Sequence, residues 1–207
     1  QKSCINCNGR GCRTCLFHGI SEFDSIEGII SRYIFKKFGG TTTKFTWIGG
    51  EDKSSLVLGD GRPFFVKLRH PNKRKSKLTS TDLNFVKLKN LKIIDKFPKK
   101  PITFSSSVKI KISSKNTLDP QYLKKLKNIC NAPVLVSEKS GKYFEKQIFS
   151  LNYKKNSSHD FSLFMKVEGG FPIRRFIEGG DVSPNISEFL NCECKCNVFD
   201  FHGIDVQ

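Results

Sequence analysis

A Glu-Asp pair stands beside a glycine-rich bend in a chain that is otherwise rich in lysine. Residues 47–68 read WIGGEDKSSLVLGDGRPFFVKL, which places Glu51 and Asp52 between an expected strand and a hairpin-like turn. A loop held by rigid strands can present a side chain to a cleft. Asp52 is therefore a candidate for chemistry on a bound partner, although a charged surface loop is the commoner explanation of such a pair.

Four of the eight cysteines lie within the first fifteen residues, in the stretch CINCNGRGCRTC: Cys4, Cys7, Cys12 and Cys15. Two C-x-x-C pairs let four thiolates converge on one tetrahedral ion, which predicts a structural Zn²⁺ site. Two disulfides and an iron–sulfur cluster are the alternatives. Because only four residues separate the pairs, His18 is a possible substitute ligand. Four thiolates fill the coordination sphere of zinc, so no catalytic role is expected for the metal.

A second group, Cys192, Cys194 and Cys196, recurs at every other position of CECKCNVFDF. On a strand these thiols share one face, together with Val198. Buried thiols that fill a core are the expected interpretation, rather than a second metal site. Cys130, which follows a predicted helix, is expected in the core as well.

The net charge is +17, with 36 Lys and Arg against 19 Asp and Glu. Basic residues cluster at 67–77, 87–100 and 124–127. An excess of this size attracts polyanions and predicts a nucleic-acid partner, whereas a solvated lysine surface is the plainer alternative. No basic amphipathic helix with a broad apolar face supports a membrane partner.

The chain has 207 residues, enough for one large domain or a domain with a small appendage. A hydrophobic fraction of 37% with 19 phenylalanines supplies a core. No apolar run approaches the roughly 18 residues that span a bilayer, and the polar N-terminus has no signal-peptide pattern. These features predict a cytoplasmic protein, and we expect a monomer.

Several segments have patterns typical of regular elements. Apolar residues at helical spacing predict a helix over 24–40, capped by Asp24 or Ser25 and ended by Gly39-Gly40. Further helices are expected near 81–91, at 119–130 behind an Asp cap with Pro120, and at 183–190. Strands are expected at 43–48, on both sides of Asp60-Gly61, and at 104–113, 133–137, 143–151, 161–167, 171–178 and 192–201. Separate helices and many strands predict an α+β fold with a mainly antiparallel sheet.

Two motifs in this order resemble the archaeal and eukaryotic tRNA pseudouridine synthase family ten: GGEDKSSLVLGDGRPF at 49–64 and GGFPIRRFIEGGDVSPNISEFL at 169–190. The resemblance runs from about residue 18 to the end, and its GEDxxxxxLGxGRPF core is specific. That family modifies uridines 54 and 55 in the T-loop of tRNA. The resemblance implies a pseudouridine synthase fold over 18–207, behind a zinc knuckle at 1–17.

The resemblance also implies roles for single residues. Asp52 matches the nucleophile that attacks the flipped uridine at C6 or at the sugar C1′, a reaction that needs no metal or cofactor. Arg174 matches the basic partner that keeps this aspartate ionised, and Arg62 matches the arginine that supports the loop. Phe104 stands where the family has a tyrosine against the target base; Phe stacks but has no hydroxyl, and core packing explains it equally well.

Lysines and an arginine near the motif are expected to bind the phosphates of the substrate: Lys53, Lys73, Arg74 and Lys75. The sequence also departs from the family. Gly50 replaces the arginine before Glu-Asp, Ser54 replaces the second aspartate, and the long N-terminal RNA-binding region is expected to be missing apart from the cysteine cluster. These departures bear on how tRNA is bound and which uridine is chosen, more than on the nucleophile.

A second function from another class is a catalytically weak, zinc-containing RNA-binding protein with the same fold. Loss of Asp52 separates the two, because it abolishes isomerisation but leaves simple binding unchanged. A zinc-dependent hydrolase is disfavoured, because four thiolates fill the metal's coordination sphere. Only four histidines are present, which offers no open His-rich site.

Overall fold

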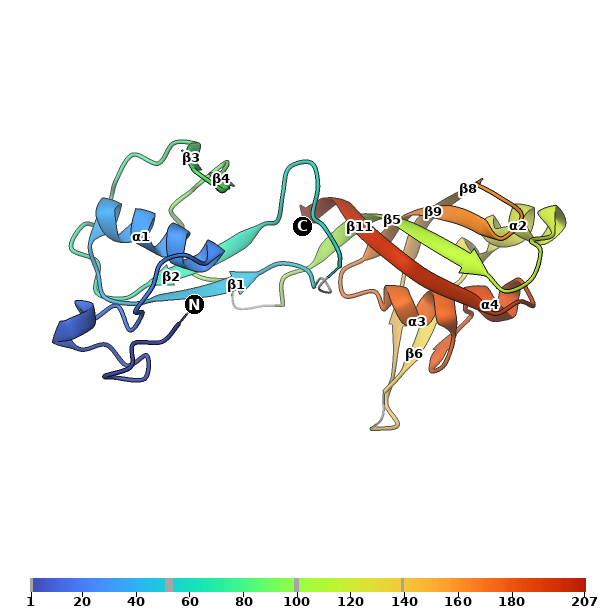
Figure 1. The fold of residues 1–207 in the computed structure, drawn as a ribbon, viewed down its shortest axis with the longest axis horizontal. Helices are drawn as coiled ribbons and strands as arrows, with labels where there is room; N and C mark the ends of the chain where they lie inside the picture. Colours follow the sequence, from blue (N-terminus) through green and yellow to red (C-terminus); the bar gives the residue numbers. More distant parts are fainter. Residues whose placement is uncertain (1, 51–53, 99–100, 139) are drawn as a thin grey trace. The chain divides into compact units, whose positions relative to one another are not determined.

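A computed structural model describes residues 2–50, 54–98, 101–138 and 140–207. The chain divides into two compact units, Gln1–Trp47 with Phe64–Lys99, and Ile48–Pro63 with Lys100–Gln207. The boundary expected after residue 17 falls inside the first unit. Each unit combines helical segments with antiparallel strand pairs, so the expected α+β class is confirmed (Figure 1). None of the helices in the described part of the chain is long and apolar enough to span a bilayer.

The first unit is built around one helix and a two-stranded sheet. Its elements are η1 (Arg13–Cys15), α1 (Ile26–Phe38), β1 (Thr43–Trp47), β2 (Phe64–Leu68), β3 (Thr81–Leu83) and β4 (Val86–Leu88). The α1 helix begins as expected, with the Ser25 side chain accepting a hydrogen bond from the Gly28 N–H, and ends at Gly39 with φ +69°. Ile30 and Ile34 of this helix form a small core with Tyr33 and Leu88.

The helix expected near 81–91 is wrong, because β3 and β4 form a hairpin there. Asn84 takes up a left-handed conformation, φ +62°, and the chain reverses after Leu83. Leu88 is then buried in the core that includes Ile30 of α1, whereas Phe85 at the turn is 94% exposed. The apolar spacing of this segment fits a short helix and a hairpin equally well, and packing against α1 selects the hairpin.

The second unit contains a four-stranded antiparallel sheet in the order β11-β5-β9-β8. Its strands are β5 (Phe104–Ser114), β8 (Ile148–Lys155), β9 (Asp160–Glu168) and β11 (Cys194–Val206). A smaller sheet has the order β10 (Val182–Ser183), β6 (Val134–Ser137) and β7 (Tyr143–Lys146). The helices are α2 (Pro120–Lys125), η2 (Leu126–Asn131), α3 (Ile173–Glu178) and α4 (Ile186–Phe189). The expected strands at 104–113, 133–137, 143–151 and 161–167 are confirmed, with 143–151 divided between two strands.

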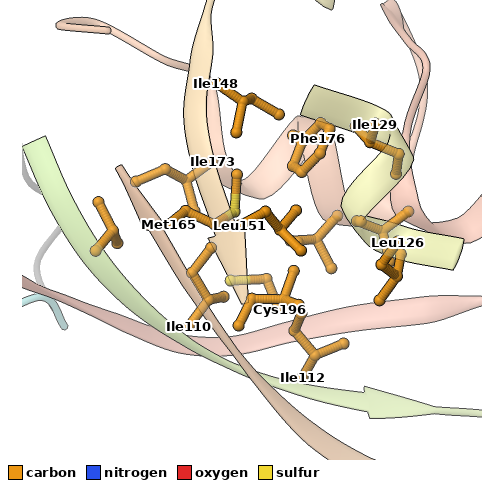
Figure 2. Close-up of a cluster of buried hydrophobic side chains, with 14 of the residues drawn as sticks. Ile110, Ile112, Leu126, Ile129, Ile148, Leu151, Met165, Ile173, Phe176 and Cys196 are labelled. Atoms are coloured by element: carbon orange, nitrogen blue, oxygen red, sulfur yellow. The ribbon is translucent and has the colours of Figure 1, made fainter. Parts of the chain in front are cut away.

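One face of the larger sheet forms the main core of this unit. Side chains from the sheet interlock there with side chains from the helices, as Figure 2 shows for Ile110, Ile112 and Met165 against Leu126 and Phe176. Both Leu126 and Phe176 are 0% exposed. This core makes the sheet a rigid support for the loops at its ends.

The basic strand expected over 171–178 is wrong, because α3 occupies this segment. Ile173, Phe176 and Ile177 are buried at i, i+3 and i+4, which is the spacing of one helical face. The helix ends at Gly179 with φ +93°. The helical spacing of these three residues is visible in the sequence between the two glycine pairs.

The cysteine strand is confirmed, with a correction to its facing pattern. Cys194 and Cys196 are buried in the core, and burial raises the pKa of the Cys194 thiol to about 12. The pairing register of β11 then shifts between Cys196 and Val198, so Phe199 and not Val198 continues the core face. Cys130 is partly buried against the same core, and burial raises its pKa too.

Candidate functional site

Asp52 and Lys53, together with Glu51, lie outside the described residues. The structure does describe the residues that flank them, from Ile48 to Gly50 on one side and from Ser54 onward on the other. The site is therefore built from the contacts of these flanks, all of which lie in the second unit.

Arg62 holds the flank that precedes Glu51. Its Nε donates a hydrogen bond of 3.0 Å to the carbonyl oxygen of Ile48, and its Nη2 donates to the carbonyl oxygen of Gly49. The Ile48 N–H in turn donates to the carbonyl of Pro63 at 3.0 Å. A planar guanidinium with several fixed donors suits two successive carbonyls. Arg62 thus fixes the backbone that leads into the Glu-Asp pair.

Arg174 contacts the flank on the other side. Its Nη2 donates a hydrogen bond of 3.4 Å to Oγ of Ser54, two positions after Asp52. Its Nη1 donates to the carbonyl of Cys196 at 3.0 Å, and the guanidinium carbon lies 5.6 Å from the centre of the Phe199 ring. The side chain is therefore oriented by β11 while it reaches the motif loop. The two arginines predicted from sequence contact opposite flanks of residues 51–53.

The second half of the loop runs along β11. The Leu56 N–H donates to Oδ1 of Asp200 at 3.1 Å, the Phe201 N–H donates to the Leu56 carbonyl at 2.8 Å, and the Leu58 N–H donates to the Phe201 carbonyl at 2.8 Å. The two strands expected around Asp60-Gly61 are therefore wrong as a hairpin. The part after the turn is β2, which pairs with β1, while the part before it attaches to β11.

Phe104, at the start of β5, lies beside the same flank. A Cβ added at Gly49 would lie 3.7 Å from Cε2 of Phe104, and a Cβ added at Gly169 would come within 2.5 Å of Cε1. The Gly169 N–H also donates to the Phe104 carbonyl at 2.7 Å. A larger residue at 169 would force the Phe104 ring to move, because the ring occupies the space of a side chain. The half-buried ring thus lies between the first glycine pair, at Gly49, and the second, at Gly169.

Sequence reasoning missed Lys146 of β7, which binds the backbone of Gly169, the glycine beside this ring. Its Nζ donates to the Gly169 carbonyl at 2.7 Å and to Oε1 of Glu168 at 2.8 Å, and its side chain is only 18% exposed. The two side chains thus form a partly buried ion pair at Gly169. No local pattern could have found it, because the pairing of β8 with β9 brings the end of β7 to Glu168 and Gly169.

The four N-terminal cysteines cluster in the first unit, as expected. All their sulfur atoms lie within 4.8 Å of one another, with Cys4–Cys12 at 3.9 Å and Cys7–Cys15 and Cys12–Cys15 at 3.8 Å. Four sulfurs at about 2.3 Å from one tetrahedral ion lie about 3.8 Å apart. A disulfide bond is about 2.05 Å long, and none of these cysteines forms one. The geometry therefore fits a single metal ion.

Backbone N–H groups favour the thiolate form of Cys15 in particular. N–H groups point at the sulfurs, from Gly11 to Cys7 at 3.2 Å, and from Cys12 and Gly19 to Cys15 at 3.3 Å each. The Cys12 N–H, and less strongly the Gly19 N–H, lower the pKa of Cys15 to about 6. A thiolate is the form that binds a metal.

His18 does not take part in the cysteine cluster. Its Nδ1 lies 2.9 Å from the Thr41 carbonyl, and its ring stacks on Phe35 of α1 with the ring centres 3.9 Å apart. Among the described residues, only the four cysteines form a group that could hold a metal. His18 instead anchors the cysteine-rich segment to the helix.

The basic segment at 73–75 leaves the first unit's core at the C-terminal end of α1. The Lys73 N–H donates to the Phe38 carbonyl at 3.1 Å, and the side chains of Lys73, Arg74 and Lys75 are exposed. They lie in the first unit, whereas Arg62, Arg174 and the flanks of Asp52 lie in the second.

Comparisons with known proteins agree with the resemblance in the motifs. The family model described as "Pus10, C-terminal" matches residues 17–205. The tRNA pseudouridine synthase Pus10 of Nitrosopumilus maritimus is 57% identical over 207 residues, covering all of this chain and 54% of that protein. The Pus10 of Cenarchaeum symbiosum is 35% identical over 205 residues, covering 99% of this chain and 51% of that protein.

A solved structure entitled "Crystal Structure of a Cbf5-Nop10-Gar1 Complex" aligns with a TM-score of 0.49 and 11% identity, covering 83% of this chain and 43% of that one. A likeness of this size does not establish a shared fold. The sequence matches are far stronger, although the chain spans about half the length of the curated relatives it matches. A family match over most of the chain, with 57% identity to one member, shows that this chain belongs to the Pus10 C-terminal family.

Proposed function

We propose that this chain is the catalytic part of a tRNA pseudouridine synthase that converts uridine to pseudouridine in the T-loop, at position 54, position 55 or both. One observation carries the proposal: Arg62 and Arg174 contact opposite flanks of the Glu-Asp pair in the family motif. A surface loop needs no such support. The names of the relatives, tRNA pseudouridine synthase Pus10, agree with it.

In this proposal Asp52 is the nucleophile. It attacks the flipped uridine at C6 or at C1′, the N1–C1′ bond breaks, the uracil rotates, a C5–C1′ bond forms, and the bond between Asp52 and the substrate breaks again. The proton on C5 leaves and N1 gains one, so the reaction is an isomerisation that needs no redox cofactor or metal. Phe104 has no hydroxyl, so another group accepts the C5 proton.

Three further side chains assist Asp52. Arg174 stabilises the ionised carboxylate through its positive charge, because an opposite charge nearby lowers a carboxyl pKa. Arg62 keeps the backbone before the nucleophile in place. Phe104 stacks on the target base, supported by its position beside Gly49. The second unit is proposed to have the pseudouridine synthase fold.

The N-terminal knuckle, residues 1–17, is proposed to bind a structural Zn²⁺ through its four cysteines. The sulfur–sulfur distances of 3.8–3.9 Å support zinc because they match a tetrahedral site with four thiolates. Phosphates of the tRNA are proposed to bind Lys53 and the exposed cations Lys73, Arg74 and Lys75. The protein is proposed to act as a monomer in the cytoplasm.

The test uses an unmodified tRNA transcript, with pseudouridine mapped by carbodiimide labelling and primer extension. The wild-type protein is expected to give a stop in the T-loop, and Asp52→Asn to abolish the stop while tRNA still binds. Glu51→Gln is the matched control, since it removes the neighbouring carboxylate and is expected to keep activity. Equal activity of Asp52→Asn and wild type would contradict the proposed role of Asp52.

A catalytically weak RNA-binding protein is the second candidate. Phe104 in place of the tyrosine and Ser54 in place of the second aspartate are the observations that favour it. If the wild-type protein binds tRNA in a salt-dependent way but forms no pseudouridine on any tRNA, this second function replaces the first.

A further inference from the structure

We infer that the outer face of the four-stranded sheet is a second RNA-binding surface, which stacks an unpaired nucleotide on Phe164 and binds neighbouring phosphates through lysines. This inference deepens the proposed function and rests on it for the identity of the RNA. The surface, named the outer face below, is formed by side chains that point away from the main core, among them Ser107, Lys109, Lys111, Asn152, Lys154, Phe164, Lys166 and Lys195. Three aspartates, Asp160, Asp200 and Asp205, point to the same side.

The pairing register defines this face. Leu151, Met165 and Val108 are paired across three strands and buried, so their side chains point into the core. The next row, Asn152, Phe164 and Lys109, therefore points to the opposite side. Phe104 lies four positions before Val108 along β5, so its side chain points to the same face of the sheet. The proposed active site therefore lies on the core side, and the outer face is a separate surface.

Phe164 is an exposed aromatic ring in polar surroundings. It is 39% exposed and does not belong to the hydrophobic core cluster. Its cross-strand neighbours are Asn152 and Lys109, and the Lys109 Nζ lies 5.6 Å from the ring centre. Aromatic rings on an open antiparallel sheet are a common platform for stacking bases of single-stranded RNA. The β-propensity of phenylalanine would explain an aromatic residue at position 164, but it would not explain the lysine beside the ring.

The charges on this face favour a polyanion. Five lysines project from it: Lys109, Lys111, Lys154, Lys166 and Lys195. Lys166 pairs with Asp205 at 3.1 Å, and Lys109 lies opposite Asp200 in the register of β5 and β11. Lys111 and Lys154 flank Ser162 in a row that contains no acid, and neither forms an ion pair with any residue that the structure describes. Lysines without acidic neighbours are typical of phosphate binding, so this row favours a polyanion.

A basic recess adjoins the outer face at its β8 edge. Its volume is about 430 Å³, and it is lined by Lys124, Lys127, Asn152 and Tyr153. Asn152 belongs to both the recess and the row that contains Phe164. In Figure 1 the strands β5, β9 and β8 lie side by side. The elements α3, α4 and β6 lie on the core side of this sheet, opposite to the outer face. An RNA strand crossing from the recess to Lys109 would pass over Phe164.

Binding of an unmodified tRNA transcript, measured by fluorescence anisotropy over a series of salt concentrations, tests the inference. Phe164→Leu is expected to raise the Kd at least fivefold, because it keeps an apolar side chain but removes the stacking ring. The triple variant Lys109→Gln, Lys111→Gln, Lys154→Gln is expected to lower the slope of log Kd against log salt by about 2. Both variants are expected to retain the wild-type kcat at saturating tRNA.

The matched control carries Tyr143→Leu and Lys142→Gln, which remove an exposed aromatic ring and an exposed lysine from the smaller sheet of the same unit. This control is expected to bind like wild type. A Kd for Phe164→Leu that equals the wild-type value would overturn the inference. So would equal losses in the outer-face variants and in the control.

Lysine acetylation of the wild-type protein, with and without RNA, gives a measurement that does not depend on a variant folding. Protection of Lys109, Lys111 and Lys154 by RNA, with Lys142 unprotected, supports the inference. If these lysines become protected without RNA when the protein concentration is raised, a second copy of the chain occupies the outer face. That result would overturn the inference.

The inference and the proposed function fail in different ways. If wild type forms pseudouridine but the outer-face variants bind tRNA normally, the inference fails alone. If wild type forms no pseudouridine, the proposed function fails, and the Kd values still decide the inference.

Discussion

The two compact units share the basic residues of the chain equally, but not its acidic residues. The first unit has 18 Lys and Arg against 5 Asp and Glu in 83 residues, a net charge of +13, and the second has 18 against 14 in 124 residues, a net charge of +4. The difference in net charge arises entirely from the smaller number of acidic residues in the first unit. The first unit therefore attracts polyanions over its whole surface, whereas the second does so only where its lysines gather without acids.

The units also differ in how they are held together. Among the described residues, the first unit buries a core cluster of four, Ile30, Tyr33, Ile34 and Leu88, whereas the second buries 26. A small core leaves a domain marginally stable unless a metal or another cross-link supports it. The comparison indicates a strongly basic unit with a small core and a cysteine cluster that could hold a metal, and a second unit whose larger core supports the loop of the family motif.

Removal of the metal is expected to give the largest difference between the units. Structural zinc sites with cysteine ligands contribute about 10–16 kcal/mol of apparent binding free energy at pH 7. Chelation should remove amide-exchange protection from residues 2–20 and weaken it in α1, where His18 stacks on Phe35. Protection of β5 and β9 should stay unchanged.

Alkylation at pH 8 provides the control within the same experiment. After chelation the four N-terminal cysteines should react within minutes, whereas Cys194, with its pKa raised to about 12 by burial, should react only on unfolding. Loss of protection in both units together would contradict the independence of the second unit.

A cavity in the second core is expected to have the next largest effect. Phe176→Ala removes a side chain that is 0% exposed and should lower the free energy of unfolding by about 3–5 kcal/mol. Phe85→Ala, at a position 94% exposed in the first unit, is the matched control and should change it by less than about 0.5 kcal/mol. Denaturant titration measures both, and similar values would contradict the expectation that burial of Phe176 stabilises the second core.

Charge removal from the first unit should weaken tRNA binding without affecting the fold. Replacing Lys73, Arg74 and Lys75 by Gln is expected to raise the Kd about tenfold at physiological salt and to reduce the salt slope by about 2–3. The kcat at saturating tRNA should stay unchanged. The control replaces the exposed Lys115 and Lys142 of the second unit by Gln. An equal loss of tRNA affinity in this control would show that binding depends on the total charge and not on where the charges lie.

A surface ion pair of the second unit is expected to have the smallest effect. The hydrogen bond and charge of Lys115 lower the pKa of Glu193, and Glu193 in turn raises the pKa of Lys115. Stability from a lowered carboxyl pKa is present above the unfolded value of 4.5 and is lost as pH falls through the folded pKa. Glu193→Gln should therefore lower the Tm by no more than about 2 °C at pH 7, and by progressively less as the pH falls below 4.5.

The sequence by itself determined the elements whose signals are local. Ser25 and Gly39 define the ends of α1, alternation defines β5, and the two C-x-x-C pairs define the cysteine cluster, because each signal depends on neighbours within a few residues. The family motif also identified Asp52 and its two arginines from sequence, although their catalytic roles stay predictions.

Where the local pattern fits both a helix and a strand, only the tertiary structure decided which of the two forms. Residues 81–88 form a hairpin because Leu88 packs into the α1 core, and residues 173–178 form a helix because three of them are buried together. The loop after Ser54 attaches to β11 through backbone hydrogen bonds that no side-chain pattern encodes. Lys146 and the outer face around Phe164 likewise follow from strand register, because pairing brings together residues that are far apart in the sequence.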